Sequence, residues 1–163
     1  MNPRLATPAD IPAILALEQL CPTAAHWTEP QYRNLLRNEV LGSISHRIAL
    51  LVEKTSNEPS ASPPQAQPAL LAFLVAHRID REWELENIAV AATARRRGLA
   101  TLLIQDLFRR ARENNSHSIF LEVRESNQLA QALYEKLGFA KSGLREGYYQ
   151  TPPEDAILYR RLL

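Results

Sequence analysis

From residue 83 onward, short apolar runs of strand length alternate with amphipathic segments of helical length. The first amphipathic segment places its leucines along one helical ridge, and the second ends at Gly138, a residue type that favours helix termination. This order restricts the chain to a mixed α/β fold, whose second-half strands we expect to be parallel neighbours joined by right-handed crossovers. The predicted strand, helix, strand, helix and strand occupy residues 83–90, 97–114, 118–124, 128–137 and 155–163.

The first half of the sequence predicts two helices and then a strand hairpin. Asp10 is placed to cap a helix within residues 7–21. Thr28 and Gln31 have the spacing of a capping box at the start of a second helix, within residues 27–40. Two apolar runs follow, and we expect them to pair as the strands of a hairpin over residues 47–54 and 69–79.

Residues 55–68 (TSNEPSASPPQAQP) contain four prolines and no large apolar side chain. Such a composition cannot offset its own ordering entropy, so we predict a disordered loop. A domain boundary is the alternative, but residues 1–54 would then hold two helices and one unpaired strand without an adequate core. We therefore predict that residues 1–163 form a single domain.

The charge of the sequence is nearly balanced, with 19 lysines and arginines against 18 aspartates and glutamates. No global field therefore draws the protein to nucleic acid or to a membrane surface, and no run approaches the ~18 apolar residues of a membrane span. The single cysteine, Cys21, excludes an internal disulfide framework and fits a reducing, cytoplasmic setting. The four histidines show no metal-ligand spacing, so we expect no metal.

Residues 94–101 (ARRRGLAT) place three arginines and a glycine where a predicted strand has ended and a long helix begins. Unpaired N–H groups and the helix dipole favour an anion at such a point, and Gly98 with Ala100 lets a phosphate approach the backbone closely. A solvated run of charge is the alternative interpretation. The glycine spacings of a P-loop or of a dinucleotide fingerprint are absent.

This segment resembles the pyrophosphate loop of the Gcn5-related N-acetyltransferase (GNAT) superfamily, whose pattern is R/Q-x-x-G-x-G/A. The preceding NIAV resembles the superfamily's fourth strand, and residues 121–139 (LEVRESNQLAQALYEKLGF) resemble its fifth strand and following helix. The resemblance implies a central twisted mixed sheet of about six to seven strands, helices on both faces, and splayed fourth and fifth strands. It also implies acetyl-CoA as cosubstrate, bound by Ile88, Ala89, Val90, Arg95, Arg96, Arg97, Gly98, Leu99, Ala100, Asn127 and Tyr134.

Two further segments, AHWTEPQY from residue 25 and GYYQTPPEDAI over residues 147–157, resemble the RimI-type branch of that superfamily. This branch acetylates the N-terminal alanine of a small-subunit ribosomal protein. The resemblance implies a monomeric enzyme that acetylates a protein N-terminus by direct transfer in a ternary complex. The alternatives are acetylation of a lysine side chain or a small amine, and a non-catalytic acyl-CoA-binding module. The resemblance places Trp27, Glu122, Tyr148 and Tyr149 at the acceptor.

Strand alternation in SIFLEVR puts Phe120, Glu122 and Arg124 on the face opposite three apolar side chains. A carboxylate in an apolar strand is either ion-paired with a neighbouring arginine or used chemically. The RimI-type resemblance implies that Glu122 is the general base, acting directly or through water.

Tyr134, on the second predicted helix of the alternating half, is either a core tyrosine or, as the resemblance implies, the general acid that protonates the coenzyme A thiolate. Asn127 is expected to cap this helix, and its family counterpart contacts the pantetheine or phosphate arm. The family places the oxyanion at a backbone N–H, here that of Val90. Cys21 has no nearby histidine in the sequence and is expected to be an inert core residue.

Overall fold

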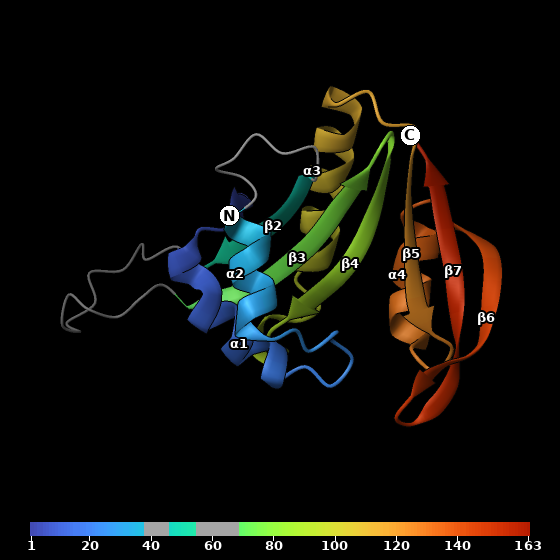
Figure 1. Cartoon of the computed structure of the whole chain (residues 1–163), viewed down its shortest axis with the longest axis horizontal. Helices are drawn as coiled ribbons and strands as arrows, with labels where there is room; N and C mark the ends of the chain where they lie inside the picture. Colours follow the sequence, from blue (N-terminus) through green and yellow to red (C-terminus); the bar gives the residue numbers. More distant parts are fainter. Residues whose placement is uncertain (38–45, 55–68) are drawn as a thin grey trace.

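The protein is described by a computed structural model that covers residues 1–37, 46–54 and 69–163. Seven strands form one sheet in the order β1-β2-β3-β4-β5-β7-β6 (Figure 1), which confirms the predicted mixed α/β fold. The strands are β1 (Arg4–Leu5), β2 (His46–Glu53), β3 (Leu70–Ile79), β4 (Glu82–Val90), β5 (Ser118–Arg124), β6 (Ala140–Gln150) and β7 (Pro153–Leu162). The helices are α1 (Ile11–Gln19), α2 (Glu29–Arg37), α3 (Leu99–Glu113) and α4 (Gln128–Lys136), with short 3₁₀ helices η1 (Pro8–Asp10) and η2 (Ala92–Ala94).

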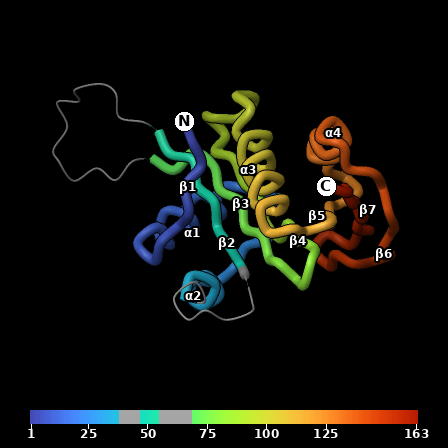
Figure 2. The backbone as a smooth tube through the Cα atoms, turned by 90° about the horizontal axis from the view of Figure 1, so that it is seen from above, coloured from blue at the N-terminus to red at the C-terminus, as the bar shows by residue number. Residues whose placement is uncertain are grey.

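Helices cover the two faces of the sheet, as predicted (Figure 2). On one face, α3 and α4 pack over a large apolar cluster that includes Leu74, Leu103 and Leu121. On the other face, α1 and α2 pack over a second cluster that includes Ile14 and Phe73. Because each fully buried side chain of this size contributes about 1.5–3 kcal/mol, these clusters fix the helices on the sheet.

A bulge in β4 reverses the faces to which its side chains point. Before the bulge, Trp83 and Leu85 join the cluster under α3. After the bulge, Asn87 and Ala89 point to the side of α1 and α2. The register with β3 shifts at this place and leaves Glu86 as the extra residue of β4. The bulge therefore changes the direction of β4 shortly before the segment that resembles the acetyl-CoA strand.

Strands β4 and β5 are splayed, as predicted. They pair in parallel from Glu82 opposite Ser118 to Leu85 opposite Leu121. Beyond that point the two ribbons separate, and Figure 1 shows the widening gap between them. The backbone groups along the second half of β4 therefore face a gap on the β5 side.

The prediction that the last strand is a parallel neighbour is wrong. β7 lies beside β5 but runs antiparallel to it, with Ser118 opposite Leu162 and Arg124 opposite Ala156. The reason is β6, which follows α4 at the edge of the sheet and returns through a tight turn into β7. The sequence of β6 is polar, and nearly all of its residues are exposed, so no apolar alternation marks it as a strand.

Strand β1, which precedes both N-terminal helices and pairs with β2, was not predicted, because two helices were expected before any strand. The remaining helices and strands agree with prediction except at their ends. β2 and β3 form the expected antiparallel hairpin. The Thr28 N–H donates to Gln31 Oε1 at 2.7 Å, as in the predicted capping box. Asp10 does precede α1, but its carboxylate accepts from the Thr7 N–H at 2.7 Å and pairs with Arg4 instead of capping that helix.

The loop predicted at 55–68 and residues 38–40 of the second predicted helix lie outside the described residues. Within the described part of the chain, no helix has the length and apolar character needed to span a membrane.

Candidate active site

The three arginines lie in the loop that leads from β4 into α3. α3 begins at Leu99 and not at Arg97, so all three precede the helix, where they are exposed. Gly98 occupies the N-cap position in the left-handed conformation, with φ of 77°, and Arg96 is also left-handed, with φ of 61°. A Cβ at Gly98 would meet no atom within 4 Å, so the positive φ and not crowding favours glycine there. The first-turn N–H groups of α3, which have no acceptor within the helix, thus combine with exposed cations to favour an anion.

The Val90 N–H lies on the edge of β4 that faces the gap. The neighbouring Ala91 N–H donates to the Leu71 carbonyl of β3 at 2.8 Å. Successive residues of a strand direct their N–H groups to opposite sides, so the Val90 N–H points away from β3. Arg95 Nε donates to the Val90 carbonyl at 3.3 Å, and buried Cys21 lies with its Sγ 3.7 Å from the same oxygen. The arginine loop and this strand edge are therefore directly connected.

Asn127 and Tyr134 come from α4, which follows β5. The Ala130 N–H donates to Asn127 Oδ1 at 3.2 Å, so the predicted helix cap is present. Tyr134 is 5% exposed and packs against the rings of Phe139 and Tyr159. Burial raises the pKa of the Tyr134 hydroxyl above its usual range, with a smaller contribution from Tyr149. This phenol therefore keeps its proton throughout the neutral range.

Glu122 lies on the face of β5 opposite the apolar cluster, as strand alternation predicts. Its side chain is 15% exposed, and its Oε1 lies 3.0 Å from Arg145 Nε of β6. Tyr148 also bonds to it, and this hydrogen bond is the main cause that raises the pKa of the Tyr148 hydroxyl. The arginine partner considered from the sequence is therefore present, and it comes from the strand that the sequence did not reveal.

Tyr148 and Tyr149 form an aromatic pair beside Glu122. Their rings meet edge to face with centroids 5.1 Å apart, and the Arg124 guanidinium lies 4.0 Å from the centroid of Tyr149. A bulge in β6 precedes Tyr149, and within it Gly147 is left-handed, with its N–H donating to Asp155 Oδ1 at 2.7 Å. This local geometry presents the two predicted acceptor-side tyrosines next to the carboxylate.

Trp27 lies on the connection between α1 and α2, and its ring packs 5.4 Å from that of Tyr32. A buried polar network holds this region: Tyr32 and Asn87 both donate to Glu18 Oε1, at 2.9 and 2.6 Å. Asn87 Oδ1 in turn accepts the Ala25 N–H at 3.2 Å, two residues before the tryptophan. The network fixes the connection to β4 beyond its bulge, on the face where α1 and α2 pack.

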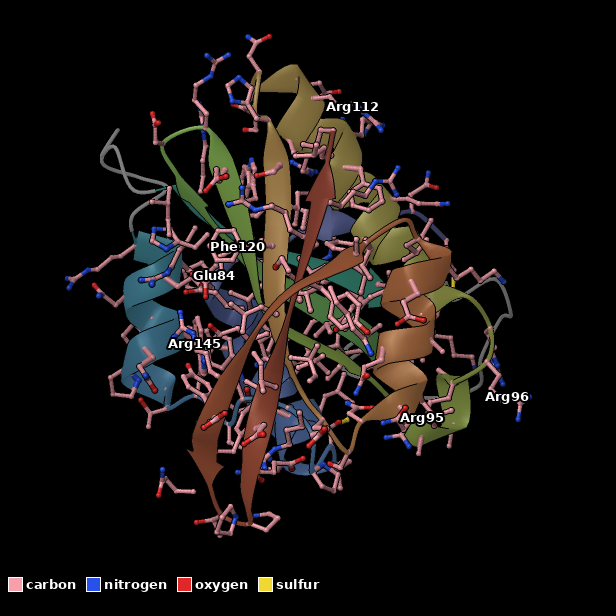
Figure 3. All side chains as sticks on the ribbon, turned by 90° about the vertical axis from the view of Figure 1, so that its right-hand side faces the viewer. Glu84, Arg95, Arg96, Arg112, Phe120 and Arg145 are labelled. Carbon is pink, nitrogen blue, oxygen red and sulfur yellow. The ribbon has the colours of Figure 1, made fainter. Side chains whose placement is uncertain are left out.

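Sequence analysis did not identify Glu84, a half-buried carboxylate of β4. Burial raises the pKa of the Glu84 carboxyl, and the neighbouring charges of Glu86 and Glu122 raise it further. Figure 3 shows Glu84, Phe120 and Arg145 on the same side of the strands. The signal that singled out Glu122, a carboxylate inside an apolar strand, is equally present in WELENIAV.

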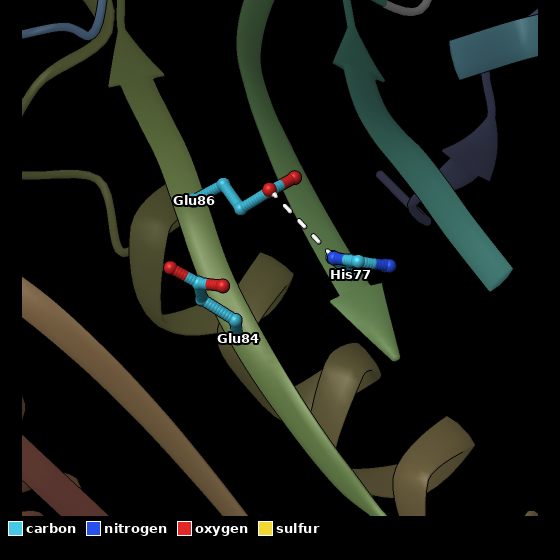
Figure 4. A group of neighbouring side chains, drawn as sticks. All are labelled: His77, Glu84 and Glu86. Atoms are coloured by element: carbon cyan, nitrogen blue, oxygen red, sulfur yellow. Dashed lines mark ion pairs between the residues drawn. The ribbon is translucent and has the colours of Figure 1, made fainter. Parts of the chain in front are cut away.

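His77, Glu84 and Glu86 form a cluster in which the potential ligand atoms all lie within 4.8 Å of one another (Figure 4). Linear spacing could not reveal it, because the residues come from two adjacent strands. Arg47 Nε and Nη2 donate to the two oxygens of Glu86 at 3.2 and 3.0 Å. Arg47 thus already pairs with both oxygens of the Glu86 carboxylate that a metal ion would need as a ligand. The group is therefore best described as an ion-pair cluster.

A splayed parallel strand pair, an arginine-rich loop at a helix N-terminus and a carboxylate beside the gap are together typical of the class of acyl-CoA-dependent acetyltransferases. The sequence profile of the acetyltransferase (GNAT) family matches residues 26–139. The chain belongs to this family.

Individual relatives point to one branch of the family. The chain is 39% identical over 95 residues to the ribosomal protein bS18-alanine N-acetyltransferase of Salmonella typhimurium, a match that covers 57% of this chain and 64% of that protein. The matched region thus spans just under two thirds of this curated relative.

Solved structures give the same fold. The crystal structure of the corresponding ribosomal-protein-alanine N-acetyltransferase from Escherichia coli has a TM-score of 0.73 and 27% identity, covering 99% of this chain and 92% of that one. NAA60 from Arabidopsis thaliana in complex with acetyl-CoA has a TM-score of 0.80 at 17% identity, covering 99% and 97%, which is a likeness of fold.

Proposed function

We propose that this protein transfers the acetyl group of acetyl-CoA to the free α-amino group of a protein N-terminus, and that the acceptor is the alanine terminus of a small-subunit ribosomal protein. The relatives named for alanine N-acetylation support this acceptor class. Such a substrate is made in the cytoplasm, where we place the protein. Residues 1–163 act as one domain in this proposal, since a single sheet includes strands from both ends of the chain.

The observation that carries the proposal is the position of Glu122 relative to the gap. Glu122 follows Leu121, the last β5 residue that pairs with β4, so it lies where the two strands part. A peptide α-amino group has a pKa of ~7.7–8.0, so much of it is protonated at neutral pH and must lose a proton before attack. In our proposal Glu122 takes that proton, directly or through water, while Tyr148 and Tyr149 line the acceptor path.

Residues on both sides of the gap fit acetyl-CoA. The exposed arginines and unpaired N–H groups at the start of α3 would hold its pyrophosphate, and Asn127 would contact the pantetheine or phosphate arm. Acetyl-CoA supplies the thioester carbon, to which the amine nitrogen forms its new bond as the carbon–sulfur bond breaks. The Val90 N–H, free of β3, would donate to the developing oxyanion. Tyr134, which keeps its proton at neutral pH, would deliver it to the departing sulfur.

The test is thiol release from acetyl-CoA with three peptides that share one sequence. One has a free N-terminal alanine, one has that terminus blocked, and one has a blocked terminus and an internal lysine. Mass spectrometry locates the acetyl group. Acetylation confined to the free alanine terminus is the expected result. Transfer to the lysine, or acetyl-CoA binding without transfer to any peptide, would overturn the proposed acceptor and favour a lysine, a small amine or a non-catalytic role.

A further inference from the structure

A pocket lies between α3, the C-terminal end of α4 and β7. Its volume is about 450 Å³, within the range of small-molecule sites. Gln105, Phe108 and Arg112 of α3 form one wall. Lys136 and Gly138 at the end of α4 and Arg161 of β7 form the rest.

The pocket is lined by three cations and by no carboxylate. Among residues 1–37, 46–54 and 69–163, none of Arg112, Lys136 and Arg161 makes an ion pair with an acidic side chain. The contrast with the rest of α3 is clear, because Arg109 and Arg110 both pair with Asp106, at 2.6 and 2.7 Å. The positive charge that α3 leaves uncompensated is therefore concentrated at this pocket.

Two of these cations, Arg112 and Arg161, are close enough to repel one another. Burial lowers the pKa of the Arg161 guanidinium, and the charge of Arg112 lowers it further. Arg161 lies with its guanidinium 4.1 Å from the centroid of the Phe108 ring and donates to the Leu137 carbonyl at the end of α4. These contacts explain the position of Arg161 as a helix-end partner. They provide no counter-charge. Arg112 and Lys136 are exposed in the last turns of α3 and α4, where the helix dipole favours a cation, but neither has an acidic partner among the described residues.

This pocket is distinct from the arginine loop at the start of α3. The helix rises about 1.5 Å per residue, so Arg112 lies roughly 20 Å along the axis from Leu99. Figure 3 shows Arg112 at one end of α3 and Arg95 and Arg96 near the other. A pyrophosphate held at the N-terminus of α3 would not reach these cations.

We propose that this pocket binds a small phosphate-bearing anion, separately from acetyl-CoA. Guanidinium groups match the geometry of phosphate oxygens, and an ammonium adds a point charge to the same site. A ligand with two or more negative charges would relieve the repulsion between Arg112 and Arg161 and pair with Lys136. The volume leaves room for an organic group or a second phosphate beside the first.

Calorimetric titration of the whole protein with inorganic pyrophosphate tests the proposal, in buffer saturated with acetyl-CoA so that the arginine loop is already occupied. We expect binding that weakens about tenfold or more in the double variant Arg112→Gln, Lys136→Gln, since each change removes a charge-assisted hydrogen bond. The matched control is Arg109→Gln, Lys141→Gln, which removes the same net charge from exposed positions. It should bind pyrophosphate like the unaltered protein.

Several outcomes would overturn the proposal. They are the absence of binding in the presence of acetyl-CoA, equal weakening by the control pair, and equal affinity for citrate, which carries negative charge without phosphate. A thermal midpoint of the double variant that is unchanged or higher without pyrophosphate establishes that it is folded. If that midpoint falls, Lys136→Gln alone, at an exposed helix end, repeats the test.

Discussion

The two halves of the sheet differ in how completely helices cover them. Strands β2, β3 and β4 contribute buried side chains to both apolar clusters, beneath α3 and beneath α1 and α2. In the described part of the chain, the cluster under α1 and α2 contains no residue of β5, β6 or β7. The outward face of these three strands carries the charged and aromatic side chains around Glu122. The covered half stabilises the fold, and the uncovered face of the other half carries the proposed base and the acceptor-side tyrosines.

The largest effect should come from Glu122→Gln on the uncovered face. The amide keeps the size of the side chain but cannot accept the proton of the amine, so we expect kcat to fall about 100- to 10,000-fold. Acetyl-CoA affinity and the thermal midpoint should change little. Steady-state kinetics with the free-alanine peptide measure this effect. Glu125→Gln, an exposed glutamate in the turn after β5, serves as the control and should be fully active. An unchanged kcat and pH-rate profile would show that Glu122 is not the base.

Substitutions in the covered half, made of β2, β3 and β4, should lower the free energy of unfolding most. Phe73 of β3 is fully buried and meets the Tyr32 ring edge to face at 6.4 Å. Phe73→Ala should lower the free energy of unfolding by about 3–5 kcal/mol, because it leaves a cavity in the core. Tyr148→Ala, at a residue 47% exposed on the uncovered half, should change it by about 0.5 kcal/mol or less. Urea unfolding measures the free energy of unfolding of both variants. Similar decreases in the two would contradict the expected difference in stability between the covered and uncovered halves.

Tyr134→Phe separates packing from proton transfer. The variant keeps the ring contacts of Tyr134 and loses only the hydroxyl, so we expect kcat to fall about 100-fold with acetyl-CoA affinity unchanged. Burial raises the pKa of this hydroxyl, so its deprotonation should not limit the rate of the unaltered protein anywhere near neutral pH. Tyr159→Phe is the matched control, a buried tyrosine 6.1 Å away that bonds to Glu135. Equal losses of kcat in both variants would assign Tyr134 a structural role only.

A smaller effect is expected from Arg145→Gln. The guanidinium 3.0 Å from Glu122 holds the carboxylate in position, so its loss should lower kcat about tenfold. Arg145→Lys should recover much of the activity, because it restores the charge. Arg160→Gln, which removes a cation paired with Glu82 at 2.7 Å, is the control. An unchanged kcat in Arg145→Gln would mean that the ion pair has no part in catalysis.

The covered half of the sheet could be predicted from the sequence more completely than the half made of β5, β6 and β7. The covered half is built from apolar segments whose length and hydrophobic pattern are typical of a strand or a helix. The bounds of β2, β3, β4 and α3 were therefore predicted to within a few residues. Glu122 was found because a carboxylate stands out in an apolar strand. The strand β6 was missed because its exposed sequence has no apolar period, and with it the antiparallel direction of β7.

The partners within the site depend on register and could not be predicted. Arg145 reaches Glu122 although β7 lies between their strands in the sheet. Glu84 approaches Glu122 from the other side because it pairs with Phe120, which lies two residues before Glu122 on the same face of β5. Neither the Arg145–Glu122 contact nor the approach of Glu84 to Glu122 can be predicted from the spacing of residues along one strand.

The smallest effect should follow from shortening the connection between β2 and β3. The Lys54 N–H donates to the Ala69 carbonyl at 3.0 Å, so the two ends of the hairpin are already adjacent. Replacing residues 55–68 with a two-residue Asn-Gly turn therefore closes the hairpin without displacing either strand. Because this connection belongs to the covered half and joins strands remote in the sheet from β5 and β6, kcat and the KM values should be unchanged, with the thermal midpoint equal or higher. A loss of activity in a folded variant would mean that these residues act on the site. The separation between the half of the sheet that stabilises the fold and the half that carries Glu122 and the acceptor-side tyrosines would then no longer hold.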